Sequence, residues 1–223
     1  MFHVKLAPGL ISEVTGINNI DQLVVDRGEQ FCALLLDANK RINLISRAGD
    51  QPLEVLRQFL ISIAALPAIP DDGEGWWLDI GSGGGFPAIP LALFRAKMHF
   101  VLADSMAKKA FFLERTVEAV PVPNVRIINT RVEAKTKLHP RGEKFDWLSV
   151  KAVTDWEETL RWGNAFLKEG GSLLTYKTGT PSADEMLAIA DLGFELHHTF
   201  DLSDFFDFTR IKILILRRVA GSM

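Results

Sequence analysis

The chain of 223 residues has a single cysteine, and this scarcity excludes two kinds of structure. With only Cys32 available, neither an intrachain disulfide nor a cysteine metal cluster can form, which fits a reducing cytosol. Cys32 lies in the apolar run of residues 31–35, so we expect it to be a buried helical residue rather than a nucleophile. The five histidines show no metal-ligand spacing with Asp or Glu, and we expect no metal.

Long apolar runs and a large excess of one charge are also absent. The longest apolar candidate, residues 59–70, falls short of the ~18 residues needed to span a membrane and contains two prolines. The N-terminus lacks the charged-then-apolar order of a signal peptide. The net charge of −3 does not advertise a polyanionic partner, so nucleic acid would have to meet a local basic patch. We expect a cytoplasmic monomer that needs no membrane.

The chain begins with helical patterns and continues with an α/β pattern. Apolar residues recur at three- and four-residue intervals over residues 20–38 and 53–63, which predicts two amphipathic helices. The acidic, glycine-containing stretch 71–75 then reads as an exposed loop. We therefore expect a helical N-terminal segment, residues 1–74, followed by a second domain, residues 75–223.

Short apolar runs alternate with helical patterns from residue 76 onward, which is typical of a mostly parallel sheet covered on both faces. The expected strands are 76–80, 99–103, 125–128, 145–150, 172–177, 194–200 and 210–216, the last two forming an antiparallel pair. The expected helices are 85–96, 106–120, one from Thr154 to the glycines 170–171, and one from Ser182 to about 193, the last two opening on capping boxes. The pattern favours the Rossmann-like fold of S-adenosylmethionine-dependent methyltransferases, in which the seven-stranded sheet ends in such a pair.

A glycine-rich turn follows the first strand of this sheet. Asp79 ends the strand, and Gly81, Gly83 and Gly85 let the backbone turn sharply and approach a ligand without Cβ interference. The helix after the turn would present free amides to a polar group. A dinucleotide fingerprint would need glycine where Phe86 stands, and no P-loop Lys-Ser/Thr follows. The spacing therefore favours S-adenosylmethionine over a pyrophosphate cofactor, with a purely structural turn as the alternative.

Polar residues also follow the next two strands. Asp104, at the end of the second strand, can accept both hydroxyls of a ribose bound across the carboxyl edge of the sheet, or it can cap the helix that follows. Arg131, Val132 and Glu133 follow the third strand and could bound an adenine ring, although alone they read as a polar loop. These residues, with the glycine turn, are our candidate cofactor site.

Four segments of the sequence resemble the bacterial 16S ribosomal RNA guanine-N7 methyltransferases, also called glucose-inhibited division protein B. Residues 39–44 resemble the family's Asn-Lys-x-x-Asn-Leu. Residues 78–91 are close to its Asp-Val-Gly-Ser-Gly-x-Gly-Phe-Pro-Gly-Ile-Pro-Leu. Residues 104–113 resemble Asp-Ser-x-x-Lys-Lys-x-x-Phe-Leu, and residues 131–133 match the run after the third strand. The resemblance spans residues 39–133, and its Phe-Pro-x-Ile-Pro extension is specific among methyltransferases.

The resemblance implies a fold, an activity and roles for individual residues. It implies that Gly81 and Phe86 line the pocket for S-adenosylmethionine, that Asp104 holds the ribose, and that Val132 and Glu133 lie at the adenine end. It also implies a helical segment ahead of the methyltransferase core and a substrate in the small ribosomal subunit.

The sequence departs from the family pattern in two places. The family often has Arg-His-x-x-Asp-Ser in its second N-terminal helix, where this chain has Gln58 and Ile61 at the histidine and aspartate positions. After the fourth strand the family has Ser-Arg-Ala, and here Lys151 stands in place of the arginine, keeping the charge but losing the forked guanidinium. The half of the pattern that faces the cofactor is intact, whereas the half that faces the substrate is altered.

Methylation at guanine N7 places few demands on catalytic residues. N7 carries a free lone pair, so no proton has to leave and no general base is expected. Catalysis would depend on positioning and on the electrostatics of the closed site. Lys151, at a strand end, is the candidate for contacting substrate or cofactor, and an exposed lysine without a role is the alternative.

Basic residues give the chain local positive charge in spite of its negative total. The candidate RNA contacts are Lys40, Arg41, Arg47, Arg57, Lys108 and Lys109. Such charges can equally form an ordinary solvated face, so RNA binding follows from the resemblance, and Trp76 and Trp77 are interpreted as packing residues rather than a stacking platform. Two other functions stay open: a methyltransferase acting on another RNA, a protein or a small molecule, and a non-catalytic protein of the same fold that scaffolds an assembly.

Overall fold

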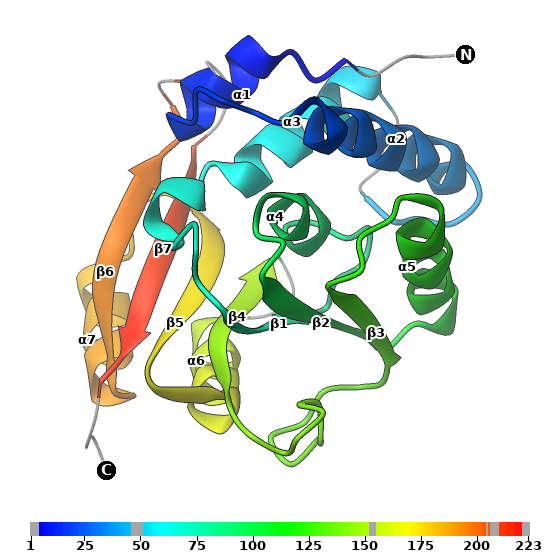
Figure 1. Cartoon of the computed structure of the whole chain (residues 1–223). Coiled ribbons are helices and arrows are strands. Elements are labelled where there is room, and N and C mark those ends of the chain that lie inside the picture. The colour runs from blue at the N-terminus through cyan, green and yellow to red at the C-terminus, as the bar shows by residue number, and fades with distance from the viewer. Residues whose placement is uncertain (1–4, 46–50, 152–154, 204, 206–209, 220–223) are drawn as a thin grey trace.

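A seven-stranded sheet between two layers of helices makes up the fold (Figure 1). The structure is a computed structural model of the chain and describes residues 5–45, 51–151, 155–203, 205 and 210–219. The strands are β1 (Gly75–Ile80), β2 (Met98–Asp104), β3 (Val125–Asn129), β4 (Phe145–Lys151), β5 (Leu167–Thr178), β6 (Phe194–Asp201) and β7 (Ile211–Arg218). The helices are α1 (Pro8–Thr15), α2 (Gln22–Asn39), α3 (Pro52–Ile63), α4 (Ala88–Phe94), α5 (Ala107–Ala119), α6 (Trp156–Phe166) and α7 (Ala183–Asp191), with a 3-10 turn at Leu66–Ala68.

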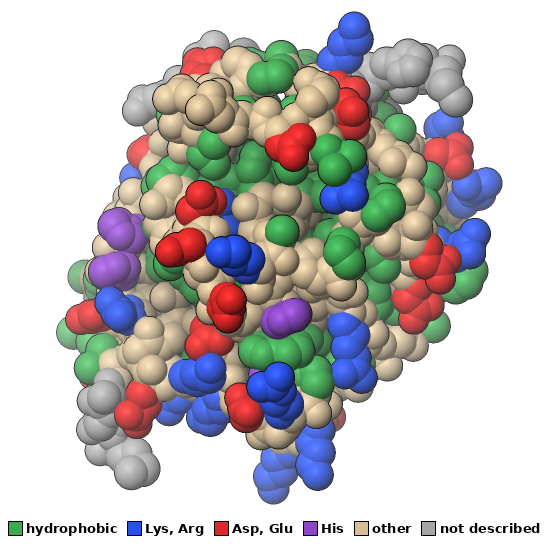
Figure 2. Space-filling model, viewed as in Figure 1, with side chains coloured by type: hydrophobic (Ala, Val, Ile, Leu, Met, Phe, Trp, Pro, Cys, Tyr) green, Lys and Arg blue, Asp and Glu red, His purple; other side chains and the backbone are tan. Residues whose placement is uncertain are grey.

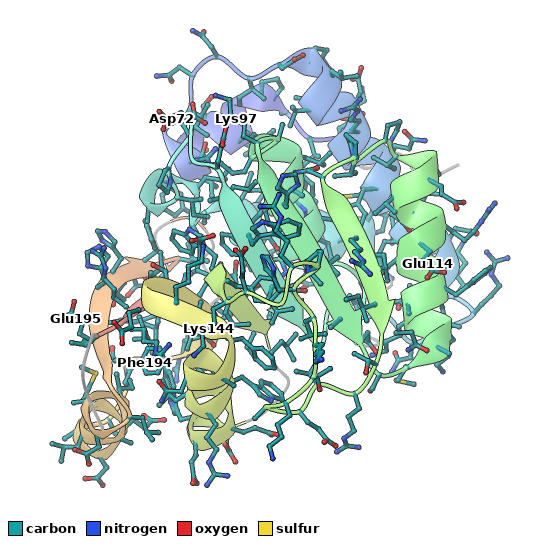
Figure 3. All side chains as sticks on the ribbon, turned by 60° about the horizontal axis from the view of Figure 1, so that its bottom comes forward. Asp72, Lys97, Glu114, Lys144, Phe194 and Glu195 are labelled. Carbon is teal, nitrogen blue, oxygen red and sulfur yellow. The ribbon has the colours of Figure 1, made fainter. Side chains whose placement is uncertain are left out.

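The strands lie in the order β3-β2-β1-β4-β5-β7-β6, which confirms the predicted fold class. Strands β1 to β5 pair in parallel, and β7 runs antiparallel to both β5 and β6. Each parallel strand is followed by a crossover, so the carboxyl ends of β1, β2 and β4 meet at one edge. Figure 3 labels Asp72, Lys97 and Lys144, which come shortly before these three strands in the chain.

The two faces of the sheet bury separate hydrophobic clusters. Helices α1 to α5 cover one face, where the cluster includes Phe31, Phe59 and Trp77. Helices α6 and α7 cover the other face, where Phe145 and Leu148 are central. Because both faces are covered, the central strands are apolar almost throughout rather than alternating, which is why short continuous apolar runs identified them in the sequence.

The N-terminal helices pack on the same core as the sheet. Leu6, Ile11 and Phe59 are buried together with α4 residues such as Ile89 and Leu91. Helix α1, which begins at a proline and ends at Gly16 in the left-handed conformation, was not predicted, because it spans only eight residues. The boundary between residues 1–74 and 75–223 stays a prediction: β1 begins at Gly75, and the helices before it share the sheet's core.

The predicted end of helix α6 and the predicted start of strand β5 are wrong. Helix α6 was expected to continue to the glycines at 170–171, but it ends at Phe166, and β5 begins at once. Leu167 is fully buried and pairs with Phe145, so tertiary packing outweighs helical preference there, and the glycines lie in an irregularity of β5. The expected cap Thr154 lies outside the described residues, and the α6 N-cap is Asp155, whose side chain accepts from the amide of Glu158.

The other expected boundaries hold more closely. The capping box of Ser182 and Glu185 opens α7 as expected. Helix α4 is shorter than expected, because the glycine turn occupies its first residues and Arg95 leaves the helical conformation. Cys32 is fully buried on α2, and burial raises the pKa of its thiol far above the ordinary value, which confirms a structural role for this side chain.

Candidate cofactor and acceptor site

A cavity of about 480 Å³ opens at the carboxyl edge of the sheet, between β1, β2 and β4 and the N-terminal helices. This edge is where parallel α/β sheets bind their ligands. The glycine turn, the start of α5 and the segment from α2 to α3 all contribute. The lining residues are Leu44, Ile45, Glu54, Gln58, Gly81, Ser82, Gly83, Gly84, Phe86, Asp104, Ser105, Met106, Lys109 and Lys151.

The glycine turn adopts the backbone conformation that its sequence requires. Gly81, Gly83 and Gly85 have φ of 74°, 52° and 92°, a region that side chains other than glycine rarely enter. The amides of Gly81 and Ser82 donate to the carbonyl of Ala103, and the amide of Gly85 donates to that of Ser82. These three amides are therefore used in closing the turn, and the expectation of free amides concerns the helix that follows it.

The glycines of the turn serve different purposes. Gly83 lines the cavity, and a Cβ there would make only ordinary van der Waals contacts, 3.7 Å or more from its neighbours. A Cβ on Gly85 would lie 2.6 Å from Ile89 Cδ1 and 3.3 Å from Leu113 Cδ2. Gly85 is thus required for close packing between the turn and its helices, and it does not line the cavity.

Asp79 is a buried carboxylic acid with one unused oxygen. The side chain is 1% exposed, and its Oδ1 accepts a short hydrogen bond from the hydroxyl of Ser149, which in turn accepts from Trp77 Nε1. Its Oδ2 is buried and finds no partner among the described residues. Burial raises the pKa of Asp79 to about 6, against the lowering effect of Ser149 and of the nearby Lys151. Asp79 itself is not among the residues that line the cavity. A buried acceptor with no partner is costly, however, so the unpaired oxygen beside the glycine turn favours a ligand at this place.

Asp104 fastens the turn to the second strand. Its Oδ2 accepts from the amide of Gly83 and its Oδ1 accepts from the amide of Met106, both at 2.8 Å. The helix α5 begins at Ala107 after Met106, so Asp104 forms a local turn rather than a helix N-cap. Each carboxylate oxygen keeps a second lone pair, and Asp104 lines the cavity, so it is still able to accept from a ribose.

Lys151 ends β4 inside the cavity and contacts the other altered position of the family pattern. Its Nζ donates to Gln58 Oε1 at 2.6 Å. The same ammonium lies 5.3 Å from the centroid of the Phe86 ring and 5.2 Å from that of Tyr176. Burial lowers the pKa of Lys151 to about 8, while Asp79 and Glu54 act in the opposite direction. Lys151 is therefore not the exposed lysine of the alternative interpretation.

The side of the cavity away from the sheet comes from the segment between α2 and α3. Asn39 Oδ1 accepts from the amides of Leu44 and Ile45, at 2.8 and 3.0 Å, and so shapes the turn that places both residues in the cavity wall. Glu54 and Gln58, one turn apart on α3, face the same cavity. Sequence reasoning missed Glu54, Ser149 and Tyr176, because nothing in their local sequence marks them.

Several predicted site residues lie elsewhere. The run Arg131, Val132 and Glu133 follows β3 but does not line the cavity: Arg131 and Glu133 are exposed, and Val132 packs against the second hydrophobic cluster. Their assignment to the adenine end stays a prediction. Asn129, at the end of β3, donates to the carbonyl of Asp104 and so ties this strand end to the cavity.

The predicted RNA contacts divide into two groups. Lys40 and Arg41 are exposed and both pair with Asp37, while Arg57 is partly buried against Glu54. Lys108 is exposed, and Lys109 lines the cavity. Arg47 lies outside the described residues. On the face in Figure 2, acidic and basic side chains are interspersed, although basic ones gather along its lower edge.

The residues that line and support the cavity fit S-adenosylmethionine. The unpaired Asp79 Oδ2 can accept from its ammonium, Gly83 lets the cofactor approach the backbone of the turn without a Cβ in the way, and Asp104 keeps acceptor capacity for its ribose. Among the described residues, no group of three or more His, Cys, Asp and Glu side chains could hold a metal ion. In the same part of the chain, no helix has the length and apolar character to cross a membrane.

The fold resembles that of solved proteins that depend on S-adenosylmethionine or hold it. A methyltransferase dependent on S-adenosylmethionine from Aquifex aeolicus superposes with a TM-score of 0.55 at 14% identity, covering 71% of this chain and 89% of that one. A variant of MtNAS in complex with S-adenosylmethionine gives a TM-score of 0.58 at 16% identity, covering 84% of this chain and 73% of the other. Together with a match of residues 25–198 to the sequence model of a methyltransferase family, the fold and the site define the class: the chain is an S-adenosylmethionine-dependent methyltransferase.

Sequence relatives narrow the class to one family. The sequence model of rRNA small subunit methyltransferase G matches residues 25–198. A protein named ribosomal RNA small subunit methyltransferase G from Deinococcus deserti is 35% identical over 72% of this chain and 66% of its own length. Its namesake from Carboxydothermus hydrogenoformans is 32% identical over 82% of this chain and 78% of its own length. The chain belongs to the family of rRNA small subunit methyltransferase G.

Proposed function

We propose that this enzyme transfers the methyl group of S-adenosylmethionine to N7 of a guanine in 16S ribosomal RNA. The observation that carries the proposal is the buried, unpaired Asp79 Oδ2 beside the glycine turn, in a chain whose relatives bear the name of a small-subunit rRNA methyltransferase. A protein that only scaffolds an assembly has no need to keep such a costly acceptor empty.

Asp79, Asp104 and the glycine turn hold the cofactor, which supplies an electrophilic methyl group on its sulfonium when bound. Asp79 Oδ2 accepts from the cofactor's ammonium, and Ser149 and Trp77 fix the orientation of this carboxylate. Asp104 accepts from the ribose while its hydrogen bond to Gly83 holds the turn in place. Phe86 closes the pocket, and Arg131, Val132 and Glu133 bound the adenine end, as the family resemblance implies.

The acceptor side of the cavity needs no general base. Guanine N7 offers its lone pair directly, so the protein has to position the base in line with the methyl group and exclude water. Lys151 is the residue placed to touch the base, since its ammonium lies beside Phe86 at the carboxyl end of β4. Reaching a base in folded RNA requires an exposed or extruded nucleotide.

The RNA approaches across the N-terminal helices and the start of α5. Lys109 in the cavity wall and the nearby Lys108 offer charge to phosphates, and Lys40, Arg41 and Arg57 extend this surface. We propose a monomer that works in the cytoplasm on the small ribosomal subunit or its RNA, without a metal.

Methyl transfer to defined acceptors tests the proposal. The enzyme is incubated with tritiated S-adenosylmethionine and, in separate reactions, small subunits lacking 7-methylguanosine, naked 16S RNA, and a panel of proteins and small molecules. Label is expected in the 16S RNA of one of the first two substrates. Label only in a protein or a small molecule would show that the enzyme is a methyltransferase with a substrate other than 16S RNA. Failure of calorimetry to detect binding of either S-adenosylmethionine or its demethylated product would exclude the class altogether.

A further inference from the structure

A line of hydrogen-bonded side chains runs from the cofactor turn to the mouth of the cavity. Lys151 Nζ donates to Gln58 Oε1 at 2.6 Å, and Gln58 Nε2 donates to Glu54 Oε1 at 2.9 Å. Arg57 Nη1 donates to Glu54 Oε2 at 3.2 Å and closes the line. Lys151, Gln58 and Glu54 all line the cavity, so the line presents a cation, an amide and a carboxylate in that order to whatever enters.

The order of these groups matches the edge of a guanine base. Along that edge guanine carries the acceptor O6, the donor N1–H and the donor amino group on C2, while N7 lies on the far side of O6. We infer that Glu54, Gln58 and Lys151 recognise the acceptor guanine, with Lys151 donating to O6 and Glu54 accepting from N1–H and the C2 amino group. This inference rests on the proposed function, because it assigns the substrate base of the same site.

The match also places N7 at the correct end of the cavity. The Lys151 ammonium is the end of the line that lies against Phe86, in the cofactor turn. A guanine whose O6 meets Lys151 therefore directs N7, the neighbour of O6, toward the turn. The reversed base would set O6 against the Glu54 carboxylate and its amino group against an ammonium, two repulsive contacts. Adenine has a donor at position 6 and an acceptor at N1, so it meets the line with both groups mismatched.

Glu54 and Lys151 both keep unused hydrogen-bonding positions that a base could occupy. The Glu54 carboxylate accepts one hydrogen bond on each oxygen, from Arg57 and from Gln58, and a carboxylate has about four lone-pair positions in all. Lys151 gives one of its three protons to Gln58. Gln58 is held at both ends, so its amide cannot flip without breaking both hydrogen bonds, and it acts as a positioning residue between the two charges.

The test compares guanosine with inosine, which lacks the C2 amino group but keeps O6, N1–H and N7. Two 16S RNAs are prepared that carry guanosine or inosine at the methylated position and are otherwise identical. Both compete for the enzyme in one reaction, so the ratio of the two products gives the ratio of their kcat/KM values even for a slow variant. Wild-type enzyme is expected to prefer guanosine about tenfold, the loss for one hydrogen bond to a charged group. The Glu54→Gln variant should bring this preference close to one, while calorimetry shows unchanged binding of S-adenosylmethionine.

The outcomes separate this inference from the proposed function. Glu13→Gln, an exposed glutamate on α1, is the matched control and should keep the wild-type ratio. If the wild-type enzyme methylates the two RNAs equally, or if Glu54→Gln keeps the full preference for guanosine, the inference that Glu54, Gln58 and Lys151 recognise the base is overturned. The proposed methyltransferase function is not affected by either result. A wild-type enzyme that methylates neither RNA overturns the proposed function itself.

Discussion

Replacing Asp79 by asparagine should stabilise the protein while it weakens cofactor binding. The carboxyl group is 1% exposed, and its pKa is raised from 3.8 to about 6 because burial penalises the charged form. For a raised pKa, the contribution of the acid to folding is fully present below the unfolded pKa and is lost as pH rises through the folded one. Above pH 6 the charge therefore costs up to about 3 kcal/mol, which asparagine would recover.

Part of this gain in stability is lost, because the substitution also removes a favourable charge interaction. Asparagine keeps an oxygen that can accept from Ser149, but it removes the negative charge that favours the ammonium of Lys151. We therefore expect a net gain of roughly 1–3 kcal/mol at pH 7.5. The same change removes the anion that meets the cofactor's ammonium, so the affinity for S-adenosylmethionine should fall about tenfold or more.

Urea unfolding followed by tryptophan fluorescence measures the change in the free energy of unfolding, and calorimetry measures the change in affinity for S-adenosylmethionine. The gain in free energy of unfolding should shrink as pH falls from 6 toward 4, because Asp79 is then protonated in the folded state and begins to be protonated in the unfolded state. Asp72→Asn, in the exposed loop before β1, is the matched control and should change neither quantity. A variant that is less stable than wild type at pH 7.5, or a gain that persists unchanged near pH 4, would refute the reasoning.

Three further predictions concern the turn, the acceptor side and the RNA. Gly85→Ala should lower the free energy of unfolding by about 1–3 kcal/mol, because its Cβ would lie 2.6 Å from Ile89 Cδ1. Gly142 also has a positive φ but nothing within 4 Å of a Cβ, so Gly142→Ala should lower the free energy of unfolding less in the same urea titration. If Lys151 donates as an ammonium, kcat/KM should decline as pH rises through about 8, and Lys151→Arg should move this decline to higher pH. Identical pH profiles for the two enzymes would show that the charge of Lys151 has no part in the reaction. Lys109→Ala should reduce the salt dependence of RNA binding, lowering the slope of log Kd against log salt by about 1, and an unchanged slope would show that Lys109 meets no phosphate.

The sequence was sufficient for the fold because its signals are local. The central strands are covered on both faces and read as continuous apolar runs, and the capping box of Ser182 and Glu185 and the glycine turn mark chain reversals. The end of α6 could not be predicted, since Leu167 is committed to the sheet by its pairing with Phe145, a contact 22 residues away in sequence.

The site was predictable only where it follows one stretch of chain. The glycine turn and Asp104 are adjacent to strand ends, so topology brings them together. Glu54 comes from α3 and Ser149 from β4, and their roles depend on packing between distant segments. The two departures from the family pattern looked independent in the sequence, yet Gln58 and Lys151 share a hydrogen bond. Two positions that depart from the family pattern are therefore in contact with each other in the cavity.

The position of the transferred methyl group tests the central claim most directly. Small subunits that lack 7-methylguanosine are incubated with the enzyme and tritiated S-adenosylmethionine, and their 16S RNA is digested to nucleosides and separated by mass. The account predicts label in 7-methylguanosine, at one site per subunit. Label in any other nucleoside, or none in the RNA while the cofactor binds, would contradict it.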